Sequence, residues 1–375
     1  MSAVSSVLKE GRLPRWAEIG LLPAINVIVA LLVGALVVVL IGENPLEVVK
    51  VLVWGAFGFQ EAIGYTLYYT TNFIFTGLAV AVAFHCGLFN IGGEGQAYMG
   101  GLGVGLVALA FDGQPFYIIL PLAMLAAALF GAAWAFIPAY LQAKRGSHIV
   151  ITTIMFNFIA STLMVYLLVN IFIKPGQMSP ESREFAENAW LPFMHEMLGW
   201  FGISFEPSPL NMSFLWALAL LVLVWLFIWH TRWGYELRTV GQNENAARYA
   251  GISPVRNIII TMLISGALAG FLGLNEILGV QHRLLLNFTA GYGFVGIAVA
   301  LMGRSHPVGI LLAALLFGAL YQGGAELSFE FPKITRDLVV VIQGLVILFA
   351  GALEYLFKPQ LLAIFRRIAL MRAGG

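Results

Sequence analysis

The stretch Gly87-Leu88-Phe89-Asn90-Ile91-Gly92-Gly93-Glu94-Gly95-Gln96 places glycines, amides and one carboxylate between two long apolar runs. Runs of this kind form membrane helices, so the stretch interrupts the chain where a span is expected. Irregular polar backbone persists at membrane depth only where protein or a water-filled cavity covers it. The stretch therefore predicts a broken membrane helix that lines a pathway for a solute.

The composition of the whole chain supports a membrane location. Hydrophobic residues make up 60% of the 375 residues, charged residues only 10%, and the mean hydropathy is +0.89. A soluble domain has about 25% charged residues, so this chain is an integral membrane protein. The single cysteine, Cys86, excludes an intrachain disulfide and a four-thiolate metal site.

Hydropathy predicts an all-α polytopic bundle with about ten spans, of which the short, glycine-rich third and eighth are half helices or broken helices. The spans are expected at 19–41, 65–84, 97–111, 115–140, 148–173, 212–231, 256–279, 288–303, 306–325 and 335–357.

The Lys and Arg residues predict the orientation of this bundle. With the amino terminus inside, fourteen of them lie on the inner side and six on the outer side. This positive-inside bias, with an even number of spans, puts both termini in the cytoplasm. We therefore expect one membrane domain, 1–375. Outside the spans it has a cytoplasmic amino-terminal segment 1–18, an extracytoplasmic loop 174–211 with a short surface segment, a cytoplasmic loop 232–255 and a cytoplasmic tail 358–375.

The cytoplasmic loop carries its own helix signals. Asn243 can cap a short helix, Gly251 can end it in the left-handed conformation, and Ser253-Pro254 can start the next helix. The small residues of this helix suit the groove of another protein. The alternative is a simple turn between two spans.

The two motifs together resemble the permease subunits of bacterial ABC importers for nucleosides and simple sugars, a group that belongs with the ribose and branched-chain amino acid permeases. The similarity runs from about Tyr65 to Leu353 and rests on 87–96 followed in order by 238–252. One departure is Arg238-Thr239, where the family pattern leads us to expect Arg-Ala, and it favours no particular substrate. The resemblance implies that a coupling helix, received by the ATPase subunit, includes Asn243, Glu244, Asn245, Ala246, Ala247, Arg248, Tyr249 and Gly251.

The resemblance also implies the partners. They are an ABC ATPase subunit, a second permease that is a different but related chain, an extracytoplasmic binding protein and a nucleoside or sugar, with the chain embedded as a multi-pass protein in the lipid of the inner membrane. No nucleic acid is expected. The chain itself would hold no cofactor and no metal, because ATP and magnesium would bind to the partner ATPase.

Polar residues within the apolar runs are the candidates for the substrate pathway, since they are costly in a bilayer. Glu94 stands among glycines beside the amides Asn90 and Gln96, a mixture that suits hydroxyl- and amide-rich solutes such as ribosides. The alternative role for Glu94 is to brace the helix break without meeting substrate.

Two further spans carry polar residues on one helical face. Tyr69 and Asn72 belong to a stripe in the second span that would suit a passing nucleobase, and Asn157 lies in the fifth span. Interhelical hydrogen bonding is the alternative role for both. Asn275 and Glu276 near the end of the seventh span would form part of an outer gate, or be solvated at the interface.

Other classes of function are weighed against this one. The sequence lacks a Gly-x-x-x-x-Gly-Lys-Ser/Thr run, so hydrolysis of ATP by a P-loop would need a partner. A proton-coupled carrier using Glu94 or Glu276 is a second candidate, although it has no use for the capped cytoplasmic helix. An intramembrane enzyme finds no support, because neither His-x-x-x-His nor Gly-x-Ser-x-Gly occurs. We expect a permease that does no chemistry and carries nucleosides, with pentoses or other simple sugars as the alternative.

Overall fold

The computed structural model describes residues 14, 17, 21–335, 338–345, 348 and 358–366. Across these residues the structure is helical and contains no β-strand. The chain forms two compact units. We call Ala56–Gln322 the central unit, and the residues up to Gly55 together with those from Gly323 the terminal unit. Each is described by itself.

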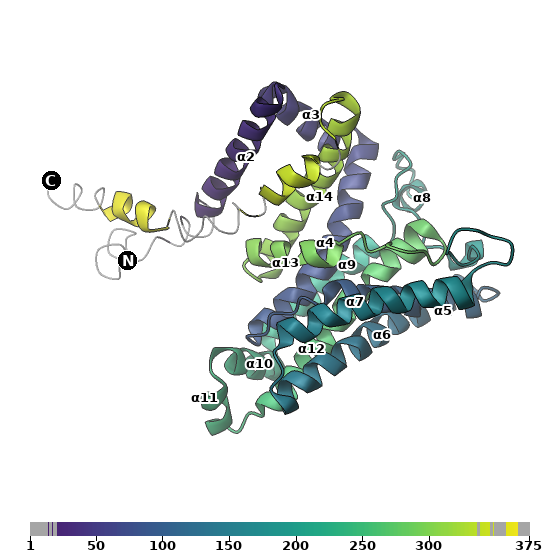
Figure 1. Ribbon diagram of the computed structural model, residues 1–375, viewed down its shortest axis with the longest axis vertical. Helices are drawn as coiled ribbons and strands as arrows, with labels where there is room; N and C mark the ends of the chain where they lie inside the picture. Colours follow the sequence, from purple (N-terminus) through teal and green to yellow (C-terminus); the bar gives the residue numbers. More distant parts are fainter. Residues whose placement is uncertain are drawn as a thin grey trace. The chain divides into compact units, whose positions relative to one another are not determined.

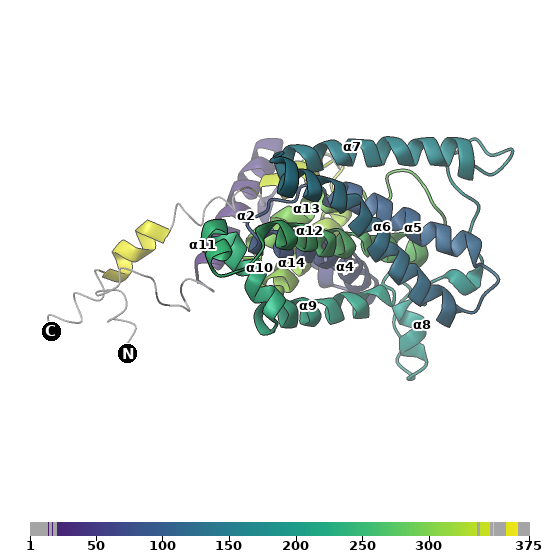
Figure 2. The ribbon, with the colours of Figure 1, turned by 90° about the horizontal axis from the view of Figure 1, so that it is seen from below.

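The helices of the central unit are shown in Figure 1. They are α4 (Gln60–His85), α5 (Gly93–Ala110), α6 (Phe116–Arg145), α7 (Ile149–Leu167), η2 (Leu168–Phe172), η3 (Glu187–Ala189), α8 (Met194–Gly199), α9 (Ser213–His230), α10 (Arg232–Gln242), α11 (Glu244–Tyr249), α12 (Pro254–Gly270), η4 (Leu274–Gln281) and α13 (Tyr292–Met302), with α14 (Pro307–Glu330) running on into the terminal unit. Helix α12 packs against α4, α5 and α6, so it is the centre of this unit. Figure 2 shows α7 and α9 along opposite edges, with α12 between them.

Glycines permit the closest of these helix contacts. A Cβ on Gly100 of α5 would lie 2.2 Å from Cα of Gly270 in α12. A Cβ on Gly131 of α6 would lie 2.2 Å from the carbonyl oxygen of Gly266. Small residues let membrane helices approach backbone to backbone, where dispersion and weak polar contacts replace the hydrophobic effect.

The terminal unit contains α2 (Leu22–Ile41), most of α3 (Pro45–Phe57) and the end of α14. The axes of 31–41 and α3 are bent by 119° at Gly42, whose φ of 84° ends α2 in the left-handed conformation. The apolar core of the terminal unit comprises Val38, Val48, Leu327, Ile334, Val339 and Ile342.

Six helices in the described residues are long and apolar enough to cross a membrane, or seven if the bent pair is one span. They match the predicted second, fourth, fifth, sixth, seventh and ninth spans. The predicted first and third spans correspond to α2 and α5, and the eighth is the short α13 of 11 residues. The predicted total of ten and the position of both termini stay predictions. Segment 1–18, the tail 358–375 and the tenth span lie wholly or partly outside the described residues.

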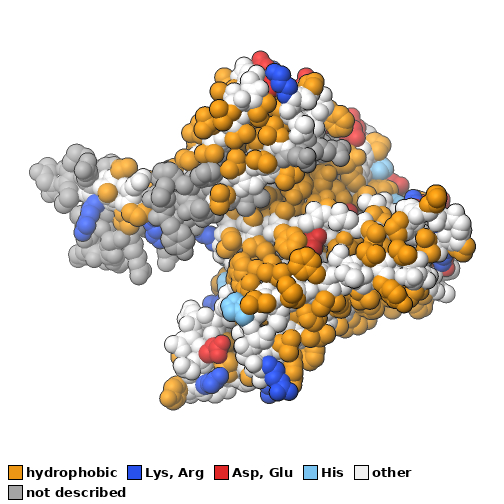
Figure 3. All heavy atoms as spheres, in the orientation of Figure 1, with side chains coloured by type: hydrophobic (Ala, Val, Ile, Leu, Met, Phe, Trp, Pro, Cys, Tyr) orange, Lys and Arg blue, Asp and Glu red, His pale blue; other side chains and the backbone are white. Residues whose placement is uncertain are grey.

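The outer surfaces of α6 and α7 are suited to lipid. Figure 3 shows apolar side chains covering the face along these helices, and charged side chains gathered at the end where α10 and α11 lie. The exposed residues of α6 and α7 include Leu125, Leu129, Ile151, Met155, Phe158 and Ile159. An apolar exterior of this size is a liability in water and a requirement in a bilayer.

Candidate functional site

The glycine-rich stretch is a helix break, as its sequence predicts. Helix α4 ends at His85, the following residues are irregular, and α5 begins only at Gly93. Gly87 has a φ of +72°, a left-handed conformation that favours glycine. Asn90 fixes the backbone of the break, because its Oδ1 accepts a hydrogen bond from the N–H of Gly92 at 2.9 Å.

Predicted pathway residues meet at this break. Asn90 is buried, and its Nδ2 donates to Oε1 of Gln96 at 2.9 Å and to Oγ of Ser265 in α12 at 2.8 Å. Asn157 of α7 accepts a hydrogen bond from the N–H of Gly95 at 2.9 Å. These amides tie the start of α5 to two neighbouring helices. For Asn157 this geometry is the interhelical bonding given as its alternative role, and contact of these residues with substrate stays a prediction.

Glu94 lies beside the break with its carboxylate directed at α13. Its Oε1 accepts from the hydroxyl of Thr289 at 2.5 Å and from the N–H of Gly291 at 2.9 Å, while Oε2 accepts from the N–H of Gly293 at 2.8 Å. The carboxylate thus binds the N–H groups at the start of α13, which have no partner within their own helix. These contacts fit a brace, and contact of Glu94 with a solute stays a prediction.

A second buried polar group surrounds Glu276 in the wide π-helical turn η4. Its Oε1 accepts from the hydroxyl of Tyr68 and from Nδ2 of Asn72, both at 2.6 Å. Asn275 donates to Oδ1 of Asn72 at 2.8 Å, and Asn211 donates to Oδ1 of Asn275 at 2.9 Å. The network therefore connects α4, η4 and the end of the outer loop.

The interface location considered for Asn275 and Glu276 is wrong. Their exposed fractions are 1% and 2%, because η4 turns them towards α4 rather than towards solvent. Sequence analysis left Glu276 out of the pathway set, although a carboxylate beside an amide within an apolar run was the available signal. π-helical turns of this kind occur frequently at functional sites.

Aromatic rings lie beside the residues that contact these two carboxylates. Tyr69 of α4 lies 6.3 Å from Tyr292 and 5.6 Å from Tyr321, measured between ring centroids. Tyr292 follows Gly291 and precedes Gly293, whose N–H groups bind Glu94. Sequence analysis singled out Tyr69 and missed Tyr292 and Tyr321, because α13 and α14 are more than 200 residues away along the chain.

The loop predicted to be cytoplasmic, 232–255, has the capping geometry that its sequence predicts. Asn243 Oδ1 accepts from the N–H groups of Asn245 and Ala246 at 2.9 and 3.0 Å, so it caps α11. Gly251 has a φ of +76°, and Ser253 caps α12 through the N–H of Arg256. These caps are confirmed. The preceding helix α10, capped by Thr231, was not predicted.

The surface of α11 differs in one respect from expectation. Ala247 is fully buried within the chain, whereas its neighbours Ala246 and Arg248 are exposed and Tyr249 is 95% exposed. The arrangement results from the 3.6-residue period of the helix, which turns one side of α11 towards the rest of the unit. The surface available to a partner is thus formed by Ala246, Arg248, Tyr249 and Ala250, and coupling to an ATPase stays a prediction.

The two motifs that carry the family resemblance touch in space. A Cβ on Gly241, at the end of α10, would lie 2.3 Å from the carbonyl oxygen of His85. A Cβ on Gly87 would lie 3.2 Å from the carbonyl oxygen of Gly241. Only glycine permits this backbone contact between the cytoplasmic loop and the helix break.

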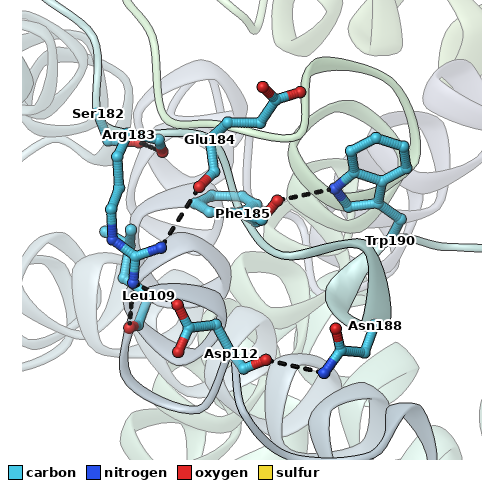
Figure 4. Close-up of polar contacts among 8 residues, drawn as sticks. All are labelled: Leu109, Asp112, Ser182, Arg183, Glu184, Phe185, Asn188 and Trp190. Carbon is cyan, nitrogen blue, oxygen red and sulfur yellow. Dashed lines mark hydrogen bonds and ion pairs between the residues drawn. The ribbon is translucent and has the colours of Figure 1, made fainter.

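The outer loop is held at one point by the end of α5. Figure 4 shows Arg183 paired with Asp112 at 2.6 Å and bonded to the carbonyl of Leu109, while Asn188 donates to the carbonyl oxygen of Asp112. Helix α8 lies in the loop where the surface segment was predicted, and Trp200 beside it is 73% exposed.

The same loop covers the residues that follow η4. Trp190 stacks on His282 with ring centroids 3.9 Å apart and an interplanar angle of 6°. Burial lowers the pKa of the His282 imidazole, because desolvation disfavours its charged form.

Broken helices around buried polar groups, an apolar exterior and a short capped helix between two spans are together typical of the membrane subunit of a transporter. The chain belongs to the family described as the permease component of a branched-chain amino acid transport system, whose model matches residues 62–351.

Curated relatives cover nearly the whole chain. A guanosine ABC transporter permease of Bacillus subtilis is 38% identical over 88% of this chain and 93% of its own length. A glucose ABC transporter permease of Haloferax volcanii is 35% identical over 94% and 92%, and a nucleoside ABC transporter permease of Lactococcus lactis is 34% identical over 91% and 93%. No solved structure matches the chain at comparable significance.

Proposed function

We propose that this chain is the membrane-spanning permease of an importer that carries nucleosides across the inner membrane, driven by ATP hydrolysis on a partner subunit. The observation that carries the proposal is the 38% identity to a guanosine permease over nearly the full length of both chains. The sequence contains no P-loop, which supports a separate ATPase.

The chemistry of the buried residues supports nucleosides as the cargo. A nucleoside combines a flat aromatic base with a ribose rich in hydroxyl groups. The central unit combines buried amides with tyrosines that meet near the start of α13. Simple sugars are the second candidate, because a glucose permease is nearly as similar to this chain as the guanosine permease.

The partners follow from the architecture of such importers. An ATPase would receive α11, a second and related permease would complete the pore, and an extracytoplasmic binding protein would deliver the solute to the outer side. Alternating access would follow from differential binding of these partners to two conformations of the pore.

Deleting the gene in its native host and measuring uptake of radiolabelled guanosine, uridine and ribose tests this proposal. We expect guanosine and uridine uptake to be lost, ribose uptake to be retained, and a plasmid copy to restore the nucleosides. Loss of ribose uptake alone would favour a sugar permease. Uptake in the plasmid-bearing strain that survives ATP depletion and collapses with the proton gradient would favour a secondary carrier.

A further inference from the structure

Four aromatic rings from three helices form one cluster in the central unit. The cluster consists of Tyr69 and Phe73 of α4, Tyr292 of α13 and Tyr321 of α14, with neighbouring ring centroids 5.0 to 6.3 Å apart. The Tyr69–Tyr292 and Phe73–Tyr292 pairs meet edge to face, which is a favourable geometry for aromatic rings.

The cluster has a buried side and an accessible side. Phe73 is fully buried and Tyr292 is 7% exposed, so these rings form the base of the cluster. Tyr69 and Tyr321 are only half-buried, so part of each residue is accessible. In a membrane helix a tyrosine is favoured at the interface or beside water, where its polar hydroxyl is solvated, and is less suited to contact with acyl chains.

The two buried carboxylates hold this cluster in position. Glu94 binds the N–H groups on both sides of Tyr292, which fixes the backbone from which that ring projects. Glu276 accepts the hydroxyl of Tyr68, the residue next to Tyr69 in the chain. The carboxylates are therefore positioning residues, and the accessible side of the cluster is formed by two uncharged aromatic residues, Tyr69 and Tyr321.

We propose that Tyr69 and Tyr321 form a stacking site for the base of the transported nucleoside, and that this site discriminates nucleosides from sugars that lack a base. This inference rests on the proposed function and adds the specificity-determining residues. Stacking of a base on an aromatic side chain contributes about 1–3 kcal/mol, which corresponds to roughly 5- to 150-fold in affinity. A pentose or glucose would gain no comparable contact.

Uptake by the deletion strain complemented with single variants tests the site. Tyr69→Leu and Tyr321→Leu remove a ring, Tyr69→Phe keeps it, and Phe75→Leu removes a ring from the same helix outside the cluster. We expect each Leu variant of the cluster to lower Vmax/KM for guanosine at least about fivefold and for uridine less, because a purine presents the larger stacking face. Phe75→Leu should stay within about twofold of the unchanged protein, and Tyr69→Phe, which keeps the ring, should lose less activity than Tyr69→Leu.

Photolabelling of membranes with 8-azidoguanosine locates the base directly. We expect labelled peptides from α4, α13 or α14, protected by excess guanosine and lost in Tyr69→Leu. Labelling elsewhere, equal losses for guanosine and uridine, or a Tyr69→Phe variant as impaired as Tyr69→Leu would each overturn the stacking site. If the unchanged protein takes up no nucleoside, the proposed function itself fails. If it does and the Leu variants match it, only this inference fails.

Discussion

At the scale of single residues, Glu94 and Glu276 are both buried without a cationic partner in the contacts described, and each is satisfied by neutral donors. Glu94 receives three hydrogen bonds from the five residues Thr289 to Gly293, where α13 begins. Both carboxylates therefore stabilise the arrangement of helices, whether or not a solute also contacts them.

The contacts of Glu94 predict graded effects of substitution. Both of its oxygens accept, so Glu94→Gln places an NH2 group against a donor, and Glu94→Ala leaves all three donors unpaired. An unpaired buried donor costs about 1–3 kcal/mol. We expect the melting temperature of the purified complex to fall in Glu94→Gln and to fall further in Glu94→Ala, with Glu330→Gln, an exposed carboxylate, as the unchanged control. A Glu94→Gln variant as stable as the unmodified protein, with altered substrate preference, would show that the brace is dispensable and that Glu94 contacts the solute.

Sequence analysis could find Glu94 but not its partners. A carboxylate among glycines in an apolar run can be recognised from the local sequence. The same local sequence suggests both candidate roles, contact with a solute and bracing of the helix break. Thr289 and Gly293 lie almost 200 residues further along the chain, and only the packing of α5 against α13 brings them to Glu94. The same distance in sequence hid the partnership of Tyr69 with Tyr292 and Tyr321.

At the scale of helices, the backbone contact between α10 and the end of α4 joins the cytoplasmic loop to the helix break. Gly241→Ala should favour the helix by up to about 1 kcal/mol through its intrinsic propensity. The new Cβ would nevertheless lie 2.3 Å from the carbonyl of His85, so α10 must move away. We expect lower nucleoside uptake and a lower melting temperature. Gly199→Ala in α8, where a Cβ meets open space, is the matched control. Equal uptake and equal melting temperature of the two variants would show that transport does not depend on the contact.

The exposed side of α11 predicts a second effect at this scale. Arg248→Glu reverses a charge, and Tyr249→Ala removes a side chain that is 95% exposed, so neither should unfold the permease. Reversing a charge at a desolvated interface typically costs several kcal/mol. We expect both variants to reach the membrane at normal levels and to lose the co-purifying ATPase. Retention of the ATPase by both would contradict docking at α11. Ala247 is unsuitable for this test, because it is buried within the chain.

Local signals account for what the sequence predicted at the helix scale. Asn243, Gly251 and Ser253 act on neighbouring N–H groups or on their own backbone, so their caps follow from a few residues. Neither the bend between α2 and α3 nor the π-helical turn η4 was predicted. The bend begins at Gly42, a local signal that sequence analysis did not use, whereas η4 packs against α4, α5 and α9.

At the scale of the whole molecule, the positions of the helices do not test the predicted orientation in the membrane. Segments 187–189 and 244–249 are separated by one apolar helix of spanning length, α9, and α8 and α11 lie at opposite ends of the central unit (Figures 1 and 2). A single crossing puts the outer loop and the coupling loop on opposite sides, and the excess of Lys and Arg assigns the coupling loop to the cytoplasm.

Single cysteines report this orientation directly, because Cys86 is the only cysteine in the sequence. Cys86→Ser provides the background, in which Asn245→Cys and Glu187→Cys each add one exposed thiol. In intact cells we expect a membrane-impermeant maleimide to label Glu187→Cys, and to label Asn245→Cys only after the membrane is opened. The background protein is the control for labelling of other groups. The reverse pattern would invert the bilayer orientation, place α11 out of reach of a cytoplasmic ATPase, and thereby contradict both the charge-based topology and the coupling role.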